Sequence, residues 1–196
     1  MRREDLQELH YITPISNVVS IMDRGILSHR RVNRIRHDSI AMQEIQDRRA
    51  QKIVPGGRQL DDYVNLYINA RNKMMFRVKD QHEEICVLRI RPDILDSPDV
   101  VVTDQNASSS YVRFEPAPRG LQIVDSDLVF ADSWIHDDQI ATWRHGSIIC
   151  AEVLVPDSVS PEYIIGAYVS CDEARRTFIN TGVSVFVKIY SHMFFR

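Results

Sequence analysis

The chain has 196 residues, a formal net charge of −3 and a sequence pI near 6.2. Hydrophobic residues make up 44% and charged residues 26%, which is ordinary for a soluble globular protein that buries a full core. The slight negative charge argues against indiscriminate binding to nucleic acid, and no apolar run approaches the length of a membrane span. Because the first residues also lack the apolar stretch of a signal peptide, we expect one cytoplasmic domain over residues 1–196, outside any membrane.

Short strands and a few helices follow one another along the chain. Residues 9–13 predict a strand, residues 17–24 a helix that ends at Gly25, and residues 39–51 a second helix with Arg48 and Arg49 in its last turn. Alternating or continuous apolar residues predict further strands, and one more helix is expected over residues 172–178. The further strands are residues 63–69, 85–90, 100–103, 147–155, 163–169 and 183–190.

The order of these elements favours an α+β domain, because strands outnumber helices and no regular βαβ alternation occurs. No glycine-rich phosphate fingerprint is present, since Gly56 and Gly57 by themselves indicate only a turn. The three cysteines, Cys86, Cys150 and Cys171, are odd in number and do not have metal-ligand spacing. We therefore expect no metal and no disulfide framework.

Basic residues gather in the N-terminal third of the chain. Few acidic residues lie between them, so the pattern is equally consistent with an anion-binding surface and with a solvated helix face. The cluster consists of Arg30, Arg31, Arg34, Arg36 and His37, followed by Arg48, Arg49, Lys52 and Arg58.

Glu152 lies in the run SIICAEVLV (147–155), which is typical of a central strand buried on both faces. A carboxylate there is costly unless it is paired or used in chemistry. The alternative is an edge strand from which Glu152 points to solvent.

Blocks of sequence over nearly the whole chain resemble the DarT family of DNA ADP-ribosyltransferases, in the order found in that family. The blocks are LHYITPISN (9–17), GILSH (25–29), IQDRR (45–49), VPGG (54–57), LDDYVNLY (60–67), RNKMM (71–75), TDQNA (103–107) and AEVLV (151–155). The resemblance implies a compact ADP-ribosyltransferase fold with split, mostly antiparallel sheets, which splits NAD and attaches ADP-ribose to a base in single-stranded DNA.

The resemblance also implies the catalytic pair. Glu152 matches the catalytic glutamate, and a fixed carboxylate beside the ribose stabilises the oxocarbenium-like charge that develops when the nicotinamide bond breaks. Arg49 matches a residue that contacts the NAD phosphate and helps to remove a proton from the acceptor base. A free guanidinium is a poor base because its pKa is so high, so phosphate binding is the simpler role. We expect Arg49, and not Arg48, to line the site.

Further NAD contacts carry over to the first strand and the helix after it. The family often has a histidine two residues before the threonine, where this chain has Tyr11, and His10 precedes it. Adjacent strand residues face opposite ways, so only one of the two faces NAD, and the register with Thr13 favours Tyr11. The NAD-binding set is Tyr11, Ile12, Thr13, Ser20, Ser28 and Arg49, with His10 as the alternative to Tyr11, and residues 33–51 correspond to the segment that covers NAD.

The expected DNA contacts combine cations for phosphate with apolar side chains that can stack on a displaced base. They are Arg71, Asn72, Lys73, Met74, Met75 and Phe76, together with Arg144 and His145. The alternative for the methionines and Phe76 is an ordinary core. Residues 125–146 are expected to form a loop that presents the acceptor, with Trp134 and Trp143 as stacking residues or as loop anchors.

The resemblance implies the toxin of a toxin–antitoxin pair, with a macrodomain antitoxin as its partner, and we expect a monomer. The acceptor is guanine or thymine, and the 103–107 block favours guanine. Two alternatives stay open: an enzyme of the same fold that modifies RNA or protein or only hydrolyses NAD, and a non-catalytic module that binds single-stranded nucleic acid.

Overall fold

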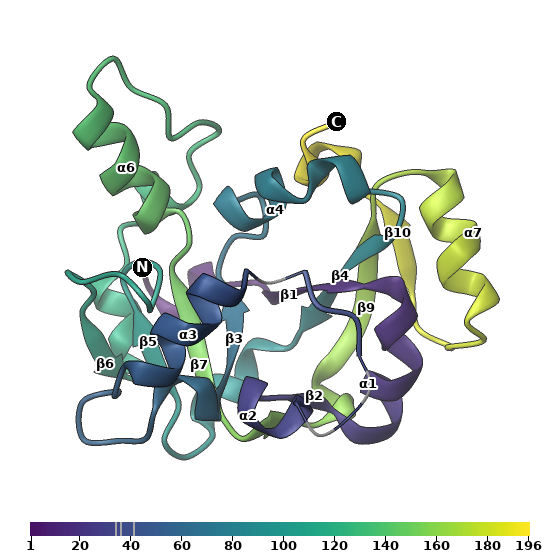
Figure 1. Cartoon of the computed structure of the whole chain (residues 1–196), viewed down its shortest axis with the longest axis horizontal. Helices are drawn as coiled ribbons and strands as arrows, with labels where there is room; N and C mark the ends of the chain where they lie inside the picture. Colours follow the sequence, from purple (N-terminus) through teal and green to yellow (C-terminus); the bar gives the residue numbers. More distant parts are fainter. Residues whose placement is uncertain (34, 36, 41) are drawn as a thin grey trace.

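A large twisted sheet forms the centre of the computed structural model, which describes residues 1–33, 35, 37–40 and 42–196 (Figure 1). Eight strands make this sheet in the order β10-β9-β4-β1-β3-β7-β5-β6, and β2 and β8 form a separate two-stranded ribbon. The strands are β1 (Leu9–Pro14), β2 (Ile26–Leu27), β3 (Tyr63–Tyr67), β4 (Ile85–Ile90), β5 (Val101–Thr103), β6 (Phe114–Pro116), β7 (Glu152–Pro156), β8 (Ser158–Val159), β9 (Ile164–Val169) and β10 (Val187–Ile189). All paired neighbours run antiparallel except β9 and β10.

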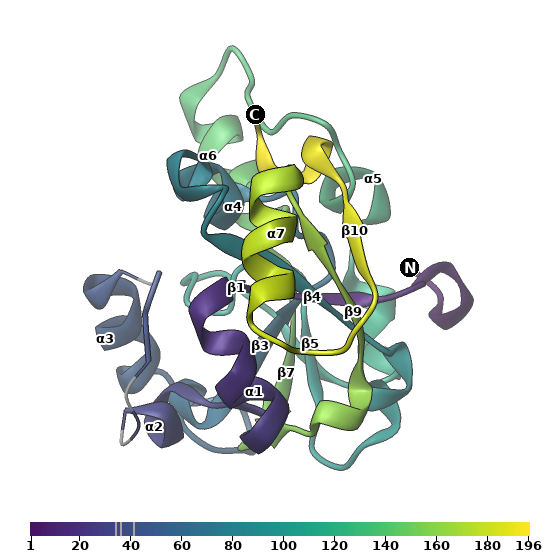
Figure 2. The same cartoon turned by 90° about the vertical axis from the view of Figure 1, so that its right-hand side faces the viewer.

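Seven α-helices and several short 3₁₀ turns surround the sheet in the part of the chain that is described. The helices are α1 (Val18–Arg24), α2 (His29–Val32), α3 (Gln43–Gln51), α4 (Lys73–Arg77), α5 (Ser126–Val129), α6 (Gln139–Ile148) and α7 (Asp172–Asn180). Figure 2 shows α1, α2 and α3 on one side of the sheet and α7 beside β9 and β10, whereas α6 projects from the body in Figure 1. None of the described helices has the length and apolar character needed to cross a lipid bilayer.

Alternation along the central strands divides the core between the two faces of the sheet. In β4, Cys86, Leu88 and Ile90 pack into one cluster with the apolar sides of α1 and α7, and Ile85 and Val87 pack into the other. The second cluster also contains α4 and the C-terminal 3₁₀ turn (Ser191–Phe194). The predicted α+β class, with a mostly antiparallel arrangement, is confirmed.

Helix ends follow local chemistry. Gly25 ends α1 with φ +83° and ψ 173°, a conformation that favours glycine, and a Cβ at this position would lie 2.5 Å from the Val159 carbonyl oxygen. The Asn72 side chain accepts hydrogen bonds from the backbone N–H groups of Met74 and Met75, and Asp138 caps α6 in the same way. These caps set the directions in which α4 and α6 leave the sheet.

Three predicted elements begin clearly later than the sequence pattern indicated. The strand predicted over 183–190 begins at Val187, as β10. The helix predicted from residue 39 begins at Gln43, and residue 41 of that prediction lies outside the described part of the chain. The strand predicted over 147–155 was wrong in its first half, because Ser147 and Ile148 end α6 and β7 begins only at Glu152. The apolar residues between them pack into the core as the end of a helix and a turn, which short apolar runs do not distinguish from a strand.

Candidate active site

A cavity of about 1100 Å³ lies where residues of β1 and β3 meet the segment that contains α2 and α3. Its walls come from β1, α1, α3, β3, α4, α6 and the loop that follows β5. The volume is at the upper end of the range for small-molecule and cofactor sites. Its lining is rich in cationic groups, including Arg48, Arg49, Lys73 and Arg77, with Asp38 among the acidic residues. The electrostatics therefore favour an anionic ligand.

Glu152 lies behind this cavity as the first residue of β7, with its side chain fully buried. Its Oε1 accepts a hydrogen bond from the Ala107 backbone N–H at 3.2 Å, and its backbone N–H donates to the Thr103 Oγ1 at 3.1 Å. Its Oε2 pairs with the Arg49 Nη1 at 3.1 Å. The carboxylate is thus fixed from the sheet, from the loop after β5 and from α3, and the alternative of a solvent-facing edge residue is wrong.

Arg49 places a guanidinium between Glu152 and the cavity. It lies in the last turn of α3, is 5% exposed and lines the cavity. Its Nη2 is buried and has no hydrogen-bond partner among the described residues, and the same is true of the Gln46 Oε1 one turn earlier. Two buried polar atoms without partners beside a cavity indicate that a polar ligand supplies the missing contacts.

Arg48 also lines the cavity, so the expectation that only Arg49 faces it was wrong. The Arg48 side chain is half exposed and its Nη2 pairs with the Glu44 carboxylate at 2.9 Å. Only Arg49 therefore reaches the buried carboxylate.

Tyr11, Ile12, Thr13 and Ser20 all line the cavity, as the NAD prediction requires. Burial raises the pKa of Tyr11 to about 12, so this phenol stays protonated at neutral pH. Ser28 is not among the described lining residues, although its neighbours Leu27 and His29 are, and its buried Oγ has no partner in the described part of the chain.

His10 is not among the described residues that line the cavity, although Ile12 on the same face of β1 and its partner Tyr67 on β3 do line it. Its Nδ1 is 3.2 Å from the Ile68 carbonyl oxygen and its Nε2 is 3.3 Å from the Glu8 carboxylate. Burial raises the pKa of Glu8, but hydrogen bonds from His10, Arg89 and Tyr168 outweigh it and lower that pKa to about 2. His10 and Tyr11 thus face opposite sides of β1, and His10 belongs to a buried polar cluster with Glu8.

The predicted DNA string 71–76 divides between the cavity and the core. Lys73, Met74 and Phe76 line the cavity. Asn72 is fully buried as the cap of α4, and Met75 is fully buried in the core, so the structure does not present either side chain to a ligand. Arg71 also points away, because its guanidinium donates to the His192 carbonyl and its Cζ lies 3.9 Å from the centre of the Phe195 ring.

The segment 125–146 holds two helices, α5 and α6, and not the single loop that was predicted. His145 is buried and holds them together, since its Nε2 is 2.8 Å from the Leu128 carbonyl and its Nδ1 is 2.8 Å from the His136 Nε2. Arg144 is exposed and is not among the described residues that line the cavity.

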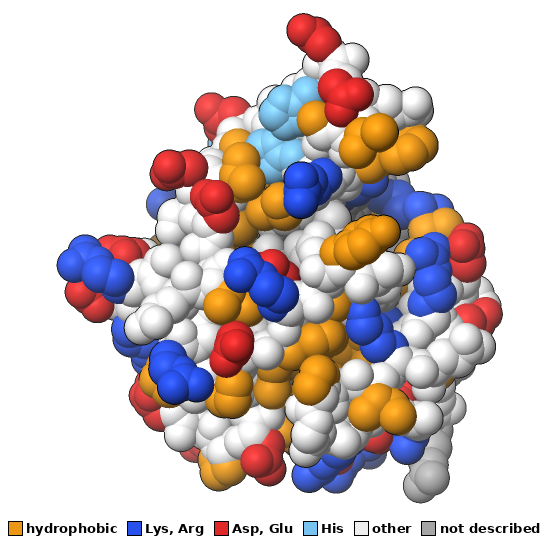
Figure 3. All heavy atoms as spheres, turned by 90° about the vertical axis from the view of Figure 1, so that its left-hand side faces the viewer, with side chains coloured by type: hydrophobic (Ala, Val, Ile, Leu, Met, Phe, Trp, Pro, Cys, Tyr) orange, Lys and Arg blue, Asp and Glu red, His pale blue; other side chains and the backbone are white. Residues whose placement is uncertain are grey.

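The two tryptophans have different positions. Trp134 is 6% exposed and packs edge-on against Phe76 and Phe195, so it anchors the segment. Trp143 is 60% exposed and lines the cavity at its rim, where it is available for stacking. Figure 3 shows hydrophobic and basic side chains next to each other on the face from which α6 projects.

Most of the basic residues in the N-terminal third are paired with acidic residues. Arg30 pairs with Asp61 and Asp62, and Arg31 and Arg58 both pair with Asp157. Arg34 and Arg36 lie outside the described residues. Of the described residues of this cluster, His37, Arg48 and Arg49 line the cavity, so an anion-binding role stays a prediction for these three.

Comparison with known proteins agrees with this geometry. The sequence model of DarT, described as an ssDNA thymidine ADP-ribosyltransferase, matches residues 10–195. The chain belongs to the DarT family. The family resemblance predicted from the sequence is confirmed.

Similar proteins come from Thermosipho africanus and from Thermus sp. 2.9. A DNA ADP-ribosyl transferase–DNA ADP-ribosyl glycohydrolase fusion protein of T. africanus (strain H17ap60334) is 32% identical over 179 residues, which cover 85% of this chain and 43% of the relative. The structure of T. africanus DarTG in complex with ADP-ribose matches with a TM-score of 0.83 and 28% identity, over 96% of this chain and 51% of that one. Thermus sp. 2.9 DarT in complex with ADP-ribosylated ssDNA matches with a TM-score of 0.81 and 22% identity, over 97% of both chains. The chain thus spans about half the length of the T. africanus proteins.

Several cavity residues of this DarT chain were not predicted as site residues. Asn65 and Tyr67 of β3 line the cavity, as do Arg77 of α4 and Tyr111 of the loop after β5. Burial raises the pKa of Tyr67 well above its usual value, and the nearby Glu152 adds to the effect. The polar alternation at positions 63, 65 and 67 was a usable indication, because these residues share one face of a strand whose other face is apolar.

Proposed function

We propose that this protein transfers ADP-ribose from NAD to a base in single-stranded DNA and releases nicotinamide. The observation that carries the proposal is the buried Glu152–Arg49 pair at the base of a large, cation-rich cavity. Family membership supports the same reaction, since the DarT model is described as an ssDNA thymidine ADP-ribosyltransferase.

NAD fits the residues that line the cavity. Its pyrophosphate is anionic, and Arg48, Arg49 and Lys73 offer cationic donors. The unpartnered Arg49 Nη2 and Gln46 Oε1 supply one donor and one acceptor, which suits a ligand with phosphate, hydroxyl and amide groups. A structure of Thermus sp. 2.9 DarT in complex with NAD⁺ has the same fold, with a TM-score of 0.76.

In the proposed reaction the bond between the ribose C1′ and the nicotinamide nitrogen breaks, and nicotinamide leaves as a neutral molecule. Positive charge then develops on the ribose, and the Glu152 carboxylate is the fixed negative group at the site. A nitrogen of the acceptor base forms the new bond to C1′ and loses its proton to solvent. Because β7 and the Ala107 N–H hold the carboxylate in advance, little reorganisation is needed during the reaction.

Arg49 has two roles in this proposal. While it is paired with Glu152, it offsets the cost of burying the carboxylate. When a substrate is bound, its free Nη2 donates to a phosphate or carbonyl oxygen. Proton removal from the acceptor base by this guanidinium is the less favoured part, because its Nη1 already donates to the Glu152 carboxylate.

The DNA strand is proposed to cross the rim between α4 and α6. Trp143, Met74 and Phe76 provide surfaces on which bases stack, and Lys73 and Arg77 provide positive charge for phosphate. We propose thymine as the acceptor, on the description of the family. The sequence block 103–107 favoured guanine, so both bases must be tested.

We also propose a partner that removes the mark. The T. africanus relative joins a DNA ADP-ribosyl transferase to a DNA ADP-ribosyl glycohydrolase in one protein. A separate or fused macrodomain with that activity is the corresponding partner for this chain, which would then be the toxin of a toxin–antitoxin pair.

The test incubates the protein with NAD and short single-stranded oligonucleotides that each contain one kind of reactive base among inert ones. Intact mass measurement should find one ADP-ribose increment on the thymine oligonucleotide. Glu152→Gln should lower the rate about 10²- to 10³-fold, whereas the exposed Glu162→Gln should react like the wild type. An increment on guanine alone would change the acceptor, and NAD consumption without a DNA adduct would move it to RNA, protein or water. No adduct and no NAD loss would refute the enzyme and favour the non-catalytic binding module.

A second comparison separates NAD cleavage from DNA binding. Arg77→Gln should weaken DNA labelling and its salt dependence, and Trp143→Ala should weaken DNA labelling, while slow NAD hydrolysis continues in both variants. Equal loss of both activities would contradict the placement of the DNA strand at this rim.

A further inference from the structure

Three side chains with metal-binding groups meet at the end of the sheet where β4 begins and β9 ends. His82 and Glu83 lie in the turn that leads into β4, and Cys171 is the residue before α7. The antiparallel register, with Val87 opposite Tyr168, brings these two chain segments together. None of the three is among the described residues that line the cavity, so the cluster has no part in the proposed transfer reaction.

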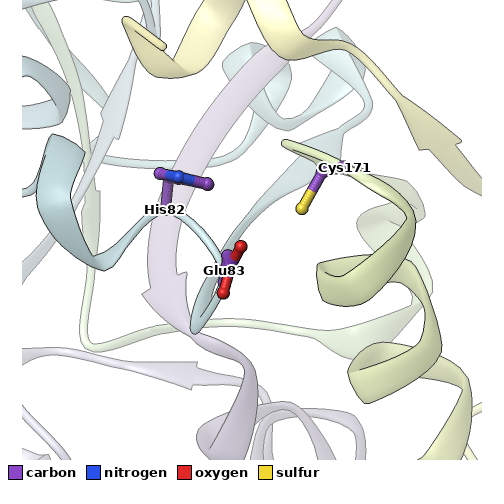
Figure 4. A group of neighbouring side chains, drawn as sticks. All are labelled: His82, Glu83 and Cys171. Carbon is purple, nitrogen blue, oxygen red and sulfur yellow. The ribbon is translucent and has the colours of Figure 1, made fainter.

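The ligand atoms of the three side chains already converge. One atom from each, an imidazole nitrogen, a carboxylate oxygen and the cysteine sulfur, lies within 4.8 Å of the others. Figure 4 shows the Cys171 sulfur and the Glu83 carboxylate directed toward the same space, with the His82 ring beside it. Ligand atoms around a tetrahedral Zn²⁺ are separated by roughly 3.5 Å, which follows from metal–ligand distances of about 2.0 to 2.3 Å. Side-chain rotations that move these atoms by about 1 Å would therefore bring them to the spacing of a tetrahedral site.

A second layer of contacts orients the cluster. The Ser170 hydroxyl donates to the His82 carbonyl oxygen at 2.7 Å, so its oxygen is free to accept from the His82 Nδ1 at 2.9 Å. In that tautomer the His82 Nε2 keeps its lone pair. Ser170 is fully buried and its oxygen also lies 3.4 Å from the Cys171 sulfur. Metal-binding histidines in proteins usually have such a partner on the second ring nitrogen.

We infer that His82, Glu83 and Cys171 form a binding site for a Zn²⁺-type transition-metal ion. The combination of thiolate and imidazole selects a borderline or soft cation and disfavours Mg²⁺ and Ca²⁺, which prefer oxygen ligands. Three protein ligands leave the fourth tetrahedral position for water. Asp172 and Glu173 in the first turn of α7 add negative charge near the ion.

Such an ion would tie the turn before β4 to the start of α7. These segments are separated by 88 positions, and the contacts of Ser170 with His82 already join them. An ion that binds only the folded state raises its stability in proportion to the logarithm of the metal concentration over Kd. The expected effect is a higher melting temperature, with no requirement for metal in DNA modification.

The test titrates the full chain, free of any polyhistidine tag and kept reduced, with Zn²⁺ and with Co²⁺. We expect one equivalent to bind, Co²⁺ to show the near-ultraviolet absorption of a thiolate ligand, and Zn²⁺ to raise the melting temperature. Cys171→Ser should abolish the thiolate band, and Ser170→Ala should weaken binding about 10- to 100-fold, as loss of a second-layer partner does.

The exposed neighbours Glu83 and Glu84 give a matched pair of variants, because neither change disturbs the core. Glu83→Gln should weaken Zn²⁺ binding at least about tenfold, as expected for loss of a carboxylate in direct contact with the ion. Glu84→Gln should bind like the wild type. Equal Zn²⁺ affinity in the wild type, Glu83→Gln and Cys171→Ser, or no binding by the wild type at micromolar concentrations, would overturn the inference.

Discussion

Replacing Arg49 by methionine should destabilise the fold, because it removes the counter-charge of a fully buried carboxylate. In the native protein the Arg49 Nη1 lies 3.1 Å from the Glu152 Oε2. Methionine fills similar space but cannot donate a hydrogen bond. Among the described residues, the Glu152 carboxylate would then keep only the hydrogen bond from the Ala107 N–H.

The expected loss is about 3 kcal/mol, at the lower end of the range measured when one partner of a buried ion pair is removed. Full burial of the carboxylate argues for a large effect. The cavity limits the effect, because Arg49 lines it and its removal lets water approach Glu152. Glu152→Gln should cost less, about 1 kcal/mol, since the amide oxygen still accepts from Ala107 and the freed guanidinium can be hydrated from the cavity.

Urea unfolding of the wild type, the two single variants and the double variant measures the coupling between the residues. In the Glu152→Gln background, Arg49→Met should cost less than about 1 kcal/mol, because no unpaired charge remains. The coupling energy should therefore be about 2 kcal/mol. A loss below about 1 kcal/mol for Arg49→Met in the wild-type background, with an unchanged denaturant slope, would refute the account of Arg49 as the counter-ion of a buried carboxylate.

Three further predictions concern stability and the DNA rim. The pKa of Glu8 is about 2 in the folded state and about 4.5 in the unfolded state, so ionised Glu8 stabilises the fold above pH 4.5 and this stabilisation is lost as the pH falls toward 2. The free energy of unfolding should therefore drop by about 3 kcal/mol between pH 4.5 and pH 2 in the wild type, and by clearly less in Glu8→Gln. Gly25→Ala should lower the free energy of unfolding in urea by about 3 kcal/mol, because the residue has a positive φ and the new Cβ would lie 2.5 Å from the Val159 carbonyl oxygen. Gly56→Ala should lower it by about 1 kcal/mol, because Gly56 has a positive φ but open space around it. Equal losses in the two variants would contradict this account. Met75→Ala should lower the free energy of unfolding by about 2 to 5 kcal/mol with little change in DNA labelling per folded molecule, because Met75 is buried in the core. Phe76→Ala should reduce DNA labelling at a small cost in stability, because Phe76 is exposed. The opposite result would mean that Met75 contacts DNA and Phe76 belongs to the core.

Periodicity in the sequence was sufficient for most of the sheet, because the apolar alternation of a strand is a local property. Residues 85–90 form β4 as predicted, and α1 ends at Gly25 as its conformational freedom requires. The run 147–155 failed because a helix end and a buried strand present the same apolar composition when the polar partner residues are distant. The hydrogen bonds from the Ile149 N–H to the His145 carbonyl and from the Cys150 N–H to the Ser147 carbonyl show that helical turns extend into this run.

A site residue could be predicted where its role depends on the residue type, and could not be predicted where its role depends on the direction in which the side chain points. Glu152 was identified because a carboxylate in an apolar run needs a partner, and Arg49 was identified through the family resemblance; the structure pairs the two. The string 71–76 forms part of a helix, and successive helix residues point in different directions, so they cannot all face one ligand. Asn72 and Met75 are buried for this reason. Pairing of surface arginines with acids far along the chain, as with Arg31, depends on tertiary contacts that no local pattern contains.

The position of Glu152 at the start of β7 has a consequence for how a substrate reaches it. Glu152 is fully buried and is not among the described residues that line the cavity, whereas Arg49 lines the cavity and pairs with it. If Glu152 contacts the ribose as proposed, Arg49 must first release the Glu152 Oε2 and take another anionic partner. NAD carries such a partner in its pyrophosphate, so binding the phosphate and uncovering the carboxylate are one event. A molecule with the ribose and nicotinamide but without the pyrophosphate should therefore bind poorly and react more slowly than NAD, because nothing compensates Arg49 for the lost ion pair.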